Sequence, residues 1–454
     1  MPNDISNSYK PHFRATLSLG LPLIGSHLMQ MVPNLTDTVM LGWYGVDELA
    51  ASVLAHSLFF IILIVGSGFA IAVMPMVASA AAVNNKTSVR RSVRMGLWIS
   101  VIYSILFIPI LLFSENLFLM LGQDENLAKS AQAYLRIAGW SIIPGLFIMA
   151  LKSFFSALER PKVVLVSLVV GGLANIFLNY ALIFGNFGCP ELGLAGAAIA
   201  TLLTTILSMV ILIYYCLFKS EYSSYAIFIN IWRVDIGAFK EVFVLGLPIG
   251  ITMLAESGLF SATAVMMGWL GTSALAAHGI AIQISGITFM IYLGLANAGT
   301  VRVGRAIGRL DYSGLRLASI AVILLTFIAV LAVALLFLII PKPLLMLFLS
   351  PTHIDTPAII LIGIPLLAIA ALFQITDGLQ VVVLGLLRGL KDTKIPMFIT
   401  TICYWGVGIP CSYVFGFVFN WNSNGIWFGL VIGLTLASTF LSIRYIKILR
   451  KDYN

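Results

Sequence analysis

Long stretches without a charged residue recur along all 454 residues of the chain. Between Lys162 and Glu191, for example, every residue is uncharged and most are apolar. A helix needs about 20 such residues to cross the hydrocarbon core of a bilayer. Hydrophobic residues make up 60% of the sequence and charged residues only 10%, whereas a soluble domain has roughly 25% charged residues. The sequence therefore predicts an all-α polytopic membrane protein and excludes a soluble multidomain enzyme.

Twelve apolar runs are long enough to be membrane spans. We place them at 15–41, 49–82, 95–114, 131–157, 163–185, 193–218, 241–268, 275–304, 317–340, 357–387, 396–419 and 425–447. With the amino terminus in the cytoplasm, the cytoplasmic segments and helix ends hold 23 of the 26 lysine and arginine residues, all except Lys129, Arg136 and Lys342. Such a bias is the usual orientation signal. Both termini are thus predicted to be cytoplasmic, and the net charge of +8 reflects topology rather than nucleic-acid binding.

The second half of the sequence repeats the first. Gly20-Leu21-Pro22 recurs as Gly246-Leu247-Pro248, and further matches keep the same offset of 226 residues (246 − 20). Two six-helix halves inserted the same way up imply pseudo-symmetry about an axis along the membrane normal. We expect two six-helix bundles around a central cleft, with an amino-terminal lobe, a cytoplasmic linker and a carboxy-terminal lobe at 1–218, 219–240 and 241–454. This architecture is typical of alternating-access carriers.

Three acidic residues are predicted to lie deep in spans, namely Asp37, Glu256 and Asp377. A carboxylate at the centre of a membrane helix costs about 2.5–3.5 kcal/mol on insertion scales, so it usually serves an ion, a proton or a cationic ligand. The alternative is an acid that is hydrogen-bonded only to fix helix packing. The candidate basic partner within a span is Arg136.

Asp37 has polar neighbours that make a cation site plausible in chemical terms. Pro33 lies four residues before it and removes one helical hydrogen bond, and broken membrane helices are tolerated where they line a cavity. Asn175 and Asn179 are four residues apart in the fifth span, and Thr201 follows in the sixth. These side chains could supply several oxygens to a sodium ion. They could equally well hydrogen-bond across helices to fix packing.

The second half offers a matching polar set. Glu256 follows the repeated motif in the seventh span, and Asp377 and Tyr292 could join it in a second cluster. Gln283 either packs or lines the cavity, and Met253 belongs to a group of methionines that could form an adaptable cavity wall. No metal-ligand spacing, nucleotide-binding loop or catalytic triad is recognisable. A transporter without a nucleotide-binding site must use an ion gradient as its energy source if it pumps. We expect no cofactor.

Several of these segments resemble the MATE family of multidrug and toxic compound extrusion transporters, specifically its NorM-type branch. They are the paired GLP motifs, PNLTDTVMLG around Asp37, MLAESGLF around Glu256 and QITDGLQVVVLGLLRGLKDTKIP around Asp377. The resemblance implies an antiporter that exports cationic and amphiphilic drugs in exchange for entering sodium ions or protons. From the three acids we predict that the entering ion neutralises, in the outward-open state, the negative charge that holds a cationic drug.

The resemblance also assigns roles to residues. It implies a first cation or proton site at Asp37, Asn175, Asn179 and Thr201, and a second at Glu256, Asp377 and Tyr292. The substrate cavity is expected to include Gln283, Met253 and Phe373, and the hinges are expected at Pro22 and Pro33. Some relatives have a tyrosine where this chain has Phe373, so a hydroxyl is missing near the second site.

Two other functions fit the architecture less well. A flippase for lipid-linked sugars would carry basic residues in its cavity to meet phosphates, whereas this sequence has acids. A polyprenyl-phosphate transferase would need catalytic acids in a large hydrophilic loop. We expect a monomeric transporter of the inner membrane, whose partners are small drugs, organic cations and membrane lipid.

Overall fold

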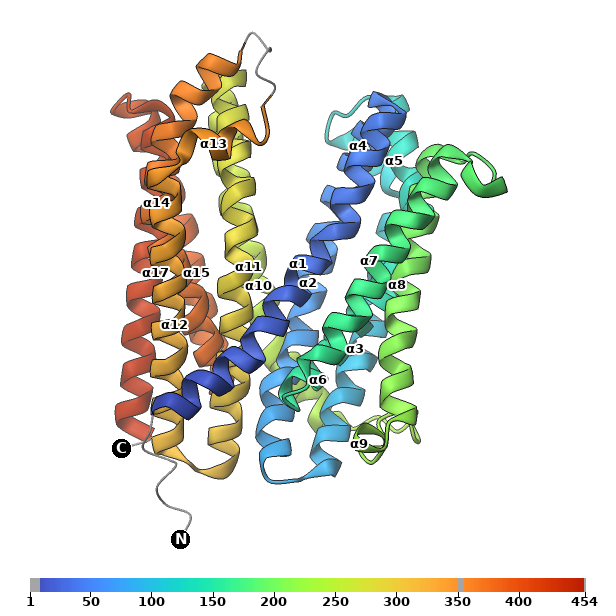
Figure 1. Ribbon diagram of the computed structural model, residues 1–454, viewed down its shortest axis with the longest axis vertical. Coiled ribbons are helices and arrows are strands. Elements are labelled where there is room, and N and C mark those ends of the chain that lie inside the picture. The colour runs from blue at the N-terminus through green and yellow to red at the C-terminus, as the bar shows by residue number, and fades with distance from the viewer. Residues whose placement is uncertain (1–8, 350–354, 453–454) are drawn as a thin grey trace. The chain divides into compact units, whose positions relative to one another are not determined.

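The computed structural model describes residues 9–349 and 355–452, which are helical apart from turns and short connections (Figure 1). Within these residues, 12 helical segments are long and apolar enough to cross a membrane, which confirms the predicted number. Six lie in the first half: α1 (Tyr9–Tyr44), α2 (Val46–Ala82), α3 (Lys86–Leu112), the segment Glu125–Ala157, α7 (Pro161–Phe184) and α8 (Gly193–Phe218). The other six are α10 (Ile236–Trp269), α11 (Thr272–Arg309), α12 (Tyr312–Ile339), α14 (Thr356–Gly389), the segment Lys394–Val418 and α17 (Asn422–Asp452).

Two of the spans are not single regular helices. The fourth consists of α5 (Glu125–Ala138), a 3₁₀ turn (Gly139–Ser141) and α6 (Ile142–Ala157). The eleventh consists of α15 (Lys394–Thr401), α16 (Ile409–Tyr413) and π-helical stretches at Ile402–Gly408 and Val414–Val418. The short helices α4 (Ser114–Met120), α9 (Ser220–Ser223) and α13 (Pro341–Met346) and a 3₁₀ turn (Asn186–Gly188) complete the described fold.

Most helices are longer than the spans predicted from apolar runs. The eighth span was predicted at 275–304, whereas α11 begins at Thr272 and ends at Arg309. The apolar run marks only the part inside the hydrocarbon core. Polar and basic residues continue the helical hydrogen bonds beyond that part, so the helix ends later than the run does.

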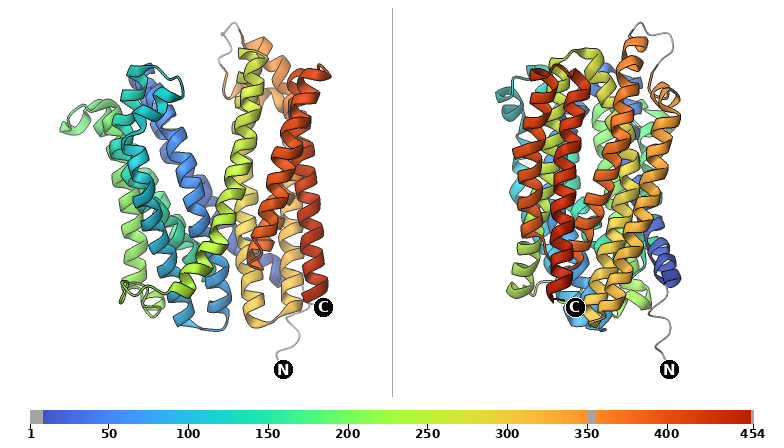
Figure 2. Two further views of the ribbon diagram at one scale, coloured as in Figure 1. Left: turned by 180° about the vertical axis from the view of Figure 1, so that it is seen from behind. Right: turned by 90° about the vertical axis from the view of Figure 1, so that its left-hand side faces the viewer.

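The chain forms two compact units: Met1–Ile24 with Ile251–Asn454, and Gly25–Gly250. We call them unit 1 and unit 2. Within each unit the long helices run side by side (Figure 2). The units differ from the predicted lobes in that the first residues of α1 pack with unit 1 and those of α10 with unit 2. Both divisions fall at equivalent places of the repeat, since 251 − 25 is again 226. The lobe boundaries themselves stay a prediction.

In unit 2, the repeated glycine motif of α10 packs closely against α2. A Cβ atom added to Gly68 would lie 2.4 Å from the backbone nitrogen of Gly250 and 2.5 Å from the carbonyl oxygen of Gly246. Real Cβ atoms do not approach backbone atoms so closely. Small residues allow two membrane helices to make such a contact, and this explains the glycines of the motif in physical terms.

Unit 1 contains an equivalent close contact, which is made by α1 and α11. A Cβ atom added to Gly294 would lie 2.7 Å from the backbone nitrogen of Ile24. Gly294 follows Gly68 by the repeat offset of 226 residues (294 − 68). The internal repeat seen in the sequence therefore extends to helix packing.

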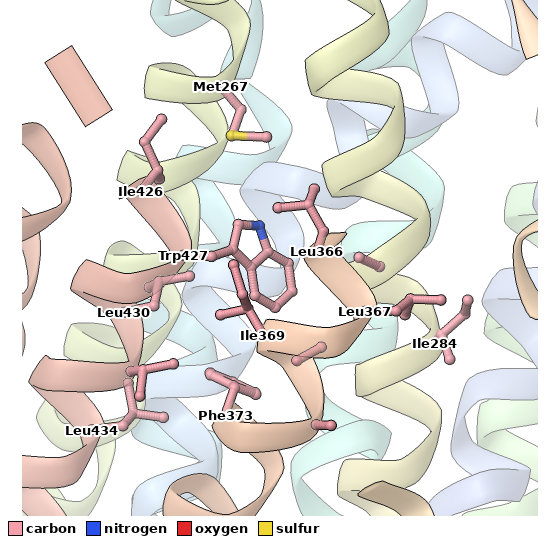
Figure 3. Packing of buried hydrophobic residues seen from close by; sticks show 14 of the residues in the cluster. Met267, Ile284, Leu366, Leu367, Ile369, Phe373, Ile426, Trp427, Leu430 and Leu434 are labelled. Carbon is pink, nitrogen blue, oxygen red and sulfur yellow. The ribbon is translucent and has the colours of Figure 1, made fainter. Parts of the chain in front are cut away.

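The apolar core of unit 1 surrounds Trp427 of α17 (Figure 3). Its indole nitrogen donates a hydrogen bond of 3.1 Å to Nδ1 of His278, which satisfies both polar groups away from water. Phe373 of α14 makes edge-on contacts with Trp427 and Phe260, at ring-centroid distances of 5.9 and 6.0 Å. Phe373 thus has a packing role in this core.

The predicted linker at 219–240 belongs to unit 2, where hydrogen bonds and an ion pair attach it to α3. The buried guanidinium of Arg94 on α3 donates hydrogen bonds to the carbonyls of Ala226, Ile227 and Ile229. Arg91, one turn earlier, forms an ion pair with Asp235. The hydrogen bond and charge of Arg91 lower the pKa of Asp235, so this pair is present at neutral pH and weakens only as the carboxyl becomes protonated in acid.

We expect Gly68→Ala to destabilise the protein by about 2 kcal/mol, the cost of forcing an extra methyl into a closely packed interface. The methyl would meet backbone atoms of α10, so α2 and α10 must separate. The measurement is the melting temperature of the purified protein in detergent. Gly279→Ala is the matched control, because a Cβ at Gly279 meets nothing within 4 Å; a comparable loss in both variants would contradict the close-contact explanation.

Candidate cation-binding sites

Asp37 of α1 is 1% exposed and lies among polar side chains of three other helices of unit 2. Asn179 of α7 donates a hydrogen bond of 2.6 Å from Nδ2 to Oδ1 of Asp37. The Thr201 hydroxyl of α8 donates to Oδ2 at 2.8 Å. Asn179 Nδ2 also donates to Oδ1 of Asn175 at 3.2 Å. The structure therefore brings together all four residues of the first predicted set.

Two atoms of this cluster have unused hydrogen-bonding capacity. Within the described chain, Oδ1 of Asn179 and Nδ2 of Asn175 are buried and have no hydrogen-bond partner. Buried polar atoms of native proteins are nearly always paired. The cluster also offers a carboxylate, two amide oxygens and a hydroxyl, which are hard ligands suited to a small cation or a proton. Cation binding at this site stays a prediction.

Tyr134 of α5 also reaches this cluster, and sequence reasoning missed it. Its hydroxyl donates to Oδ2 of Asp37 at 3.4 Å, and its ring lies 5.7 Å from that of His56 on α2. A single tyrosine in an apolar run is not distinctive, because tyrosine is also common where spans meet the membrane surface. Only the fold shows that this residue faces Asp37.

The second predicted set lies in unit 1. Gln380 of α14 donates a hydrogen bond of 3.2 Å from Nε2 to Oε1 of Glu256 on α10. Asp377, three residues before Gln380, is 2% exposed and interacts electrostatically with Glu256. Tyr292 of α11 is fully buried and interacts electrostatically with Asp377. All three predicted residues thus lie near one another.

This second cluster contains buried acceptors without donors. Among the described residues, Oδ1 of Asp377 and the Oε1 atoms of Gln374 and Gln380 have no hydrogen-bond partner. Gln374 uses its amide nitrogen, which donates to the Thr288 hydroxyl at 2.9 Å. Unpaired oxygens next to two carboxylates are the arrangement that a bound cation or proton would complete.

The basic partner of the acids was predicted wrongly. Arg136 is exposed and donates a hydrogen bond of 3.4 Å from Nε to the carbonyl oxygen of Leu112. Arg388, which the charge pattern placed at a cytoplasmic helix end, is 8% exposed and interacts electrostatically with Glu256. Charge counts along a sequence find helix ends but not the depth to which a long arginine side chain reaches back into the bundle.

The remaining residues predicted for the cavity and the hinges lie on α1, α10 and α11. Gln283 is exposed on α11, and Met253 is half-buried on α10. Pro22 and Pro33 both lie inside the continuous helix α1. The cavity and hinge roles of these four residues stay predictions.

Comparison with known proteins identifies the fold. Residues 22–181 and 248–414 match the family model described as MatE. A protein of Rhizobium meliloti (strain 1021) named "Probable multidrug resistance protein NorM" is 45% identical over 445 residues, which are 98% of this chain and 95% of that protein. A protein of the same name from Agrobacterium fabrum is 40% identical over 447 residues, covering 98% of this chain and 96% of that protein.

Solved structures have the same fold. One, described as the outward-facing conformation of a multidrug resistance MATE family transporter of the MOP superfamily, matches with a TM-score of 0.86 at 21% identity and covers 97% of each chain. The crystal structure of the eukaryotic MATE transporter AtDTX14 matches with a TM-score of 0.85 at 19% identity and covers 96% of each chain. The family model, the two relatives and the shared fold together show that this chain belongs to the MATE family of membrane transporters.

Proposed function

We propose that this protein exports cationic and amphiphilic drugs across the inner membrane in exchange for entering sodium ions or protons. The names of its relatives, probable multidrug resistance proteins, support the drug part of this proposal. Both termini are proposed to be cytoplasmic, as the distribution of lysine and arginine predicts. The protein is proposed to work as a monomer and without a cofactor.

The Asp37 cluster is the observation that carries the proposal. Its carboxylate is buried in a membrane helix, and its hydrogen-bond partners in the described part of the chain, Asn179, Thr201 and Tyr134, are neutral. A buried negative charge of this kind is stabilised by a cation. A sodium ion, a proton or a cationic group on a drug can each supply the balancing charge. Competition between them at one carboxylate would enforce exchange, since the arriving ion removes the charge that holds the drug.

The second cluster would bind one cation on the same reasoning. Glu256 and Asp377 contribute two negative charges when both are ionised, and the nearby Arg388 contributes one positive charge. The remaining charge of minus one is balanced by one sodium ion or one proton. Binding in unit 1 would then stabilise one of the two states between which the transporter alternates.

A flippase for lipid-linked sugars remains the second candidate. Lys152 is 5% exposed in unit 2, and a buried lysine could meet a phosphate. One structural neighbour, with a TM-score of 0.86 and 21% identity, is described as having a binding pocket of reverse polarity that suggests a different function. A flippase would move lipid-linked phosphates between leaflets, whereas the proposed antiporter would not.

The proposal is tested by drug efflux in proteoliposomes with a sodium gradient and a proton gradient imposed separately. We expect accumulation of a fluorescent cationic drug with at least one gradient and none without. Equal uptake without any gradient would contradict antiport. Movement of a labelled lipid-linked phosphate without drug transport would instead favour the flippase.

A further inference from the structure

Lys152 is a buried lysine whose hydrogen-bond partners are neutral side chains. Its Nζ atom lies 3.2 Å from Nδ1 and 3.3 Å from Nε2 of His27, and it donates a hydrogen bond of 3.1 Å to Oε1 of Gln30. Lys152 is 5% and His27 9% exposed. The lysine comes from α6 and its two partners from α1, all within unit 2. The sequence pattern had assigned Lys152 to a cytoplasmic helix end, so this cluster was not predicted.

The helices that pack against α6 place no acid against Lys152 in the described part of the chain. On α2, Asp47 and Glu48 lie in the first turn, and His56 pairs with the carbonyl oxygen of Ser52. Of the ionisable groups on the other helices, Arg94 and Tyr103 of α3 donate to backbone carbonyls. Lys162 of α7 is exposed, and Cys216 of α8 is a buried free thiol. Within the described residues, the helices packed against α6 therefore leave the imidazole of His27 and the amide of Gln30 as the side chains that contact the amine of Lys152.

Two nitrogen bases at this distance bind protons as one unit. If both were protonated, two buried positive charges would lie about 3 Å apart, which is strongly unfavourable in a poorly solvated site. With one proton, the ammonium of Lys152 donates to the lone pair of the His27 ring and to Gln30. With none, the site loses its charge and the two bases remain in contact. We propose that Lys152 and His27 form a proton-binding site that holds one exchangeable proton between them.

This site is distinct from the cation site but lies on the same helix face. His27, Gln30 and Asp37 are spaced by 3 and 7 residues along α1, which places them on one side of the helix. His27 and Asp37 are separated by a rise of about 15 Å. At this separation and an effective dielectric of about 20, the charge of Asp37 changes the proton affinity of the pair roughly sixfold. A cation that neutralises Asp37 would thus favour departure of the proton from Lys152 Nζ to water.

The test is ¹⁵N NMR of the full-length protein in lipid nanodiscs, with labelled histidine, across a range of about pH 5 to 9. The chain has only 5 histidines, and loss of a signal in His27→Gln assigns His27. We expect the His27 ring signals to follow a single titration in the wild type. In Lys152→Met this titration should disappear, or its midpoint should shift by more than tenfold in proton concentration. In Asp37→Asn the midpoint should shift several-fold in proton concentration.

Lys162→Met is the matched control, because it removes an exposed lysine of the neighbouring helix and should leave the His27 titration unchanged. If Lys152→Met cannot be purified in folded form, the titration is followed on ¹⁵N-labelled lysine side chains in the wild type and in His27→Gln. His27 signals that stay constant over the whole range, or that titrate alike with and without Lys152, would overturn the inference. The NMR titration does not depend on drug efflux, so a failure of this inference can be distinguished from a failure of the proposed antiport.

Discussion

Asp37→Asn is expected to reduce ion-driven drug efflux at least tenfold while leaving the protein folded in the membrane. Asparagine has nearly the same shape as aspartate and can still accept a hydrogen bond from Asn179 or Thr201, whose donors lie 2.6 and 2.8 Å from the carboxylate. What it lacks is the charge that the coupling ion and the drug would share. The measurement is initial efflux rate in energised proteoliposomes, normalised to the amount of folded protein.

Asp47→Asn is the matched control for this variant. It makes the same chemical change at an exposed acid in the first turn of α2, and we expect normal efflux. Thr201→Val keeps the side-chain volume but removes a hydroxyl that donates to Asp37, so it should weaken sodium-driven efflux more than Thr201→Ser does. Undiminished efflux in Asp37→Asn would remove the central role that we give to this carboxylate.

The fold was largely predictable because membrane spans leave a simple signature. Twenty or so apolar residues must be consecutive to cross a bilayer, and each span reverses the side of the next loop, so the basic residues check the count. Helix ends were less predictable, as the extension of α11 to Arg309 shows. The first GLP motif belongs to unit 1 and the second to unit 2. This assignment could not be predicted, because it depends on contacts such as that of Gly68 with Gly250.

The candidate sites were predictable where a polar side chain was unusual in its surroundings. Asp37 and the Asn175–Asn179 pair are conspicuous in apolar runs, and they do meet. Lys152 and Arg388 were assigned to helix ends because a sequence gives the position of a charge along a helix but not the direction of its side chain. Their burial depends on which neighbouring helices cover them, and this is information only the fold contains.

Arg388→Leu is expected to destabilise unit 1 by about 3 kcal/mol, because it leaves Glu256, a half-buried acid in a membrane span, without its nearby opposite charge. Glu256 interacts electrostatically with Arg388, and Asp377 in turn interacts with Glu256. The double variant Arg388→Leu/Glu256→Gln removes both members of the pair and should regain most of the lost stability, since replacing a whole buried pair is often nearly neutral. The measurement is the melting temperature of the purified protein in detergent.

Sodium provides the second readout of the same variant. Without Arg388, two carboxylates lie near one another with no balancing charge, so a bound cation should stabilise the variant more than the wild type by mass action. Arg444→Leu is the matched control: it breaks a hydrogen-bonded ion pair of 2.9 Å with Asp392 that is partly exposed, and such pairs contribute about 0–1 kcal/mol. An equal loss in Arg388→Leu and Arg444→Leu, or no recovery in the double variant, would show that Arg388 does not balance Glu256. Recovery together with an increased sodium effect would show that Arg388 balances Glu256 and that the cation takes over this balance when Arg388 is absent.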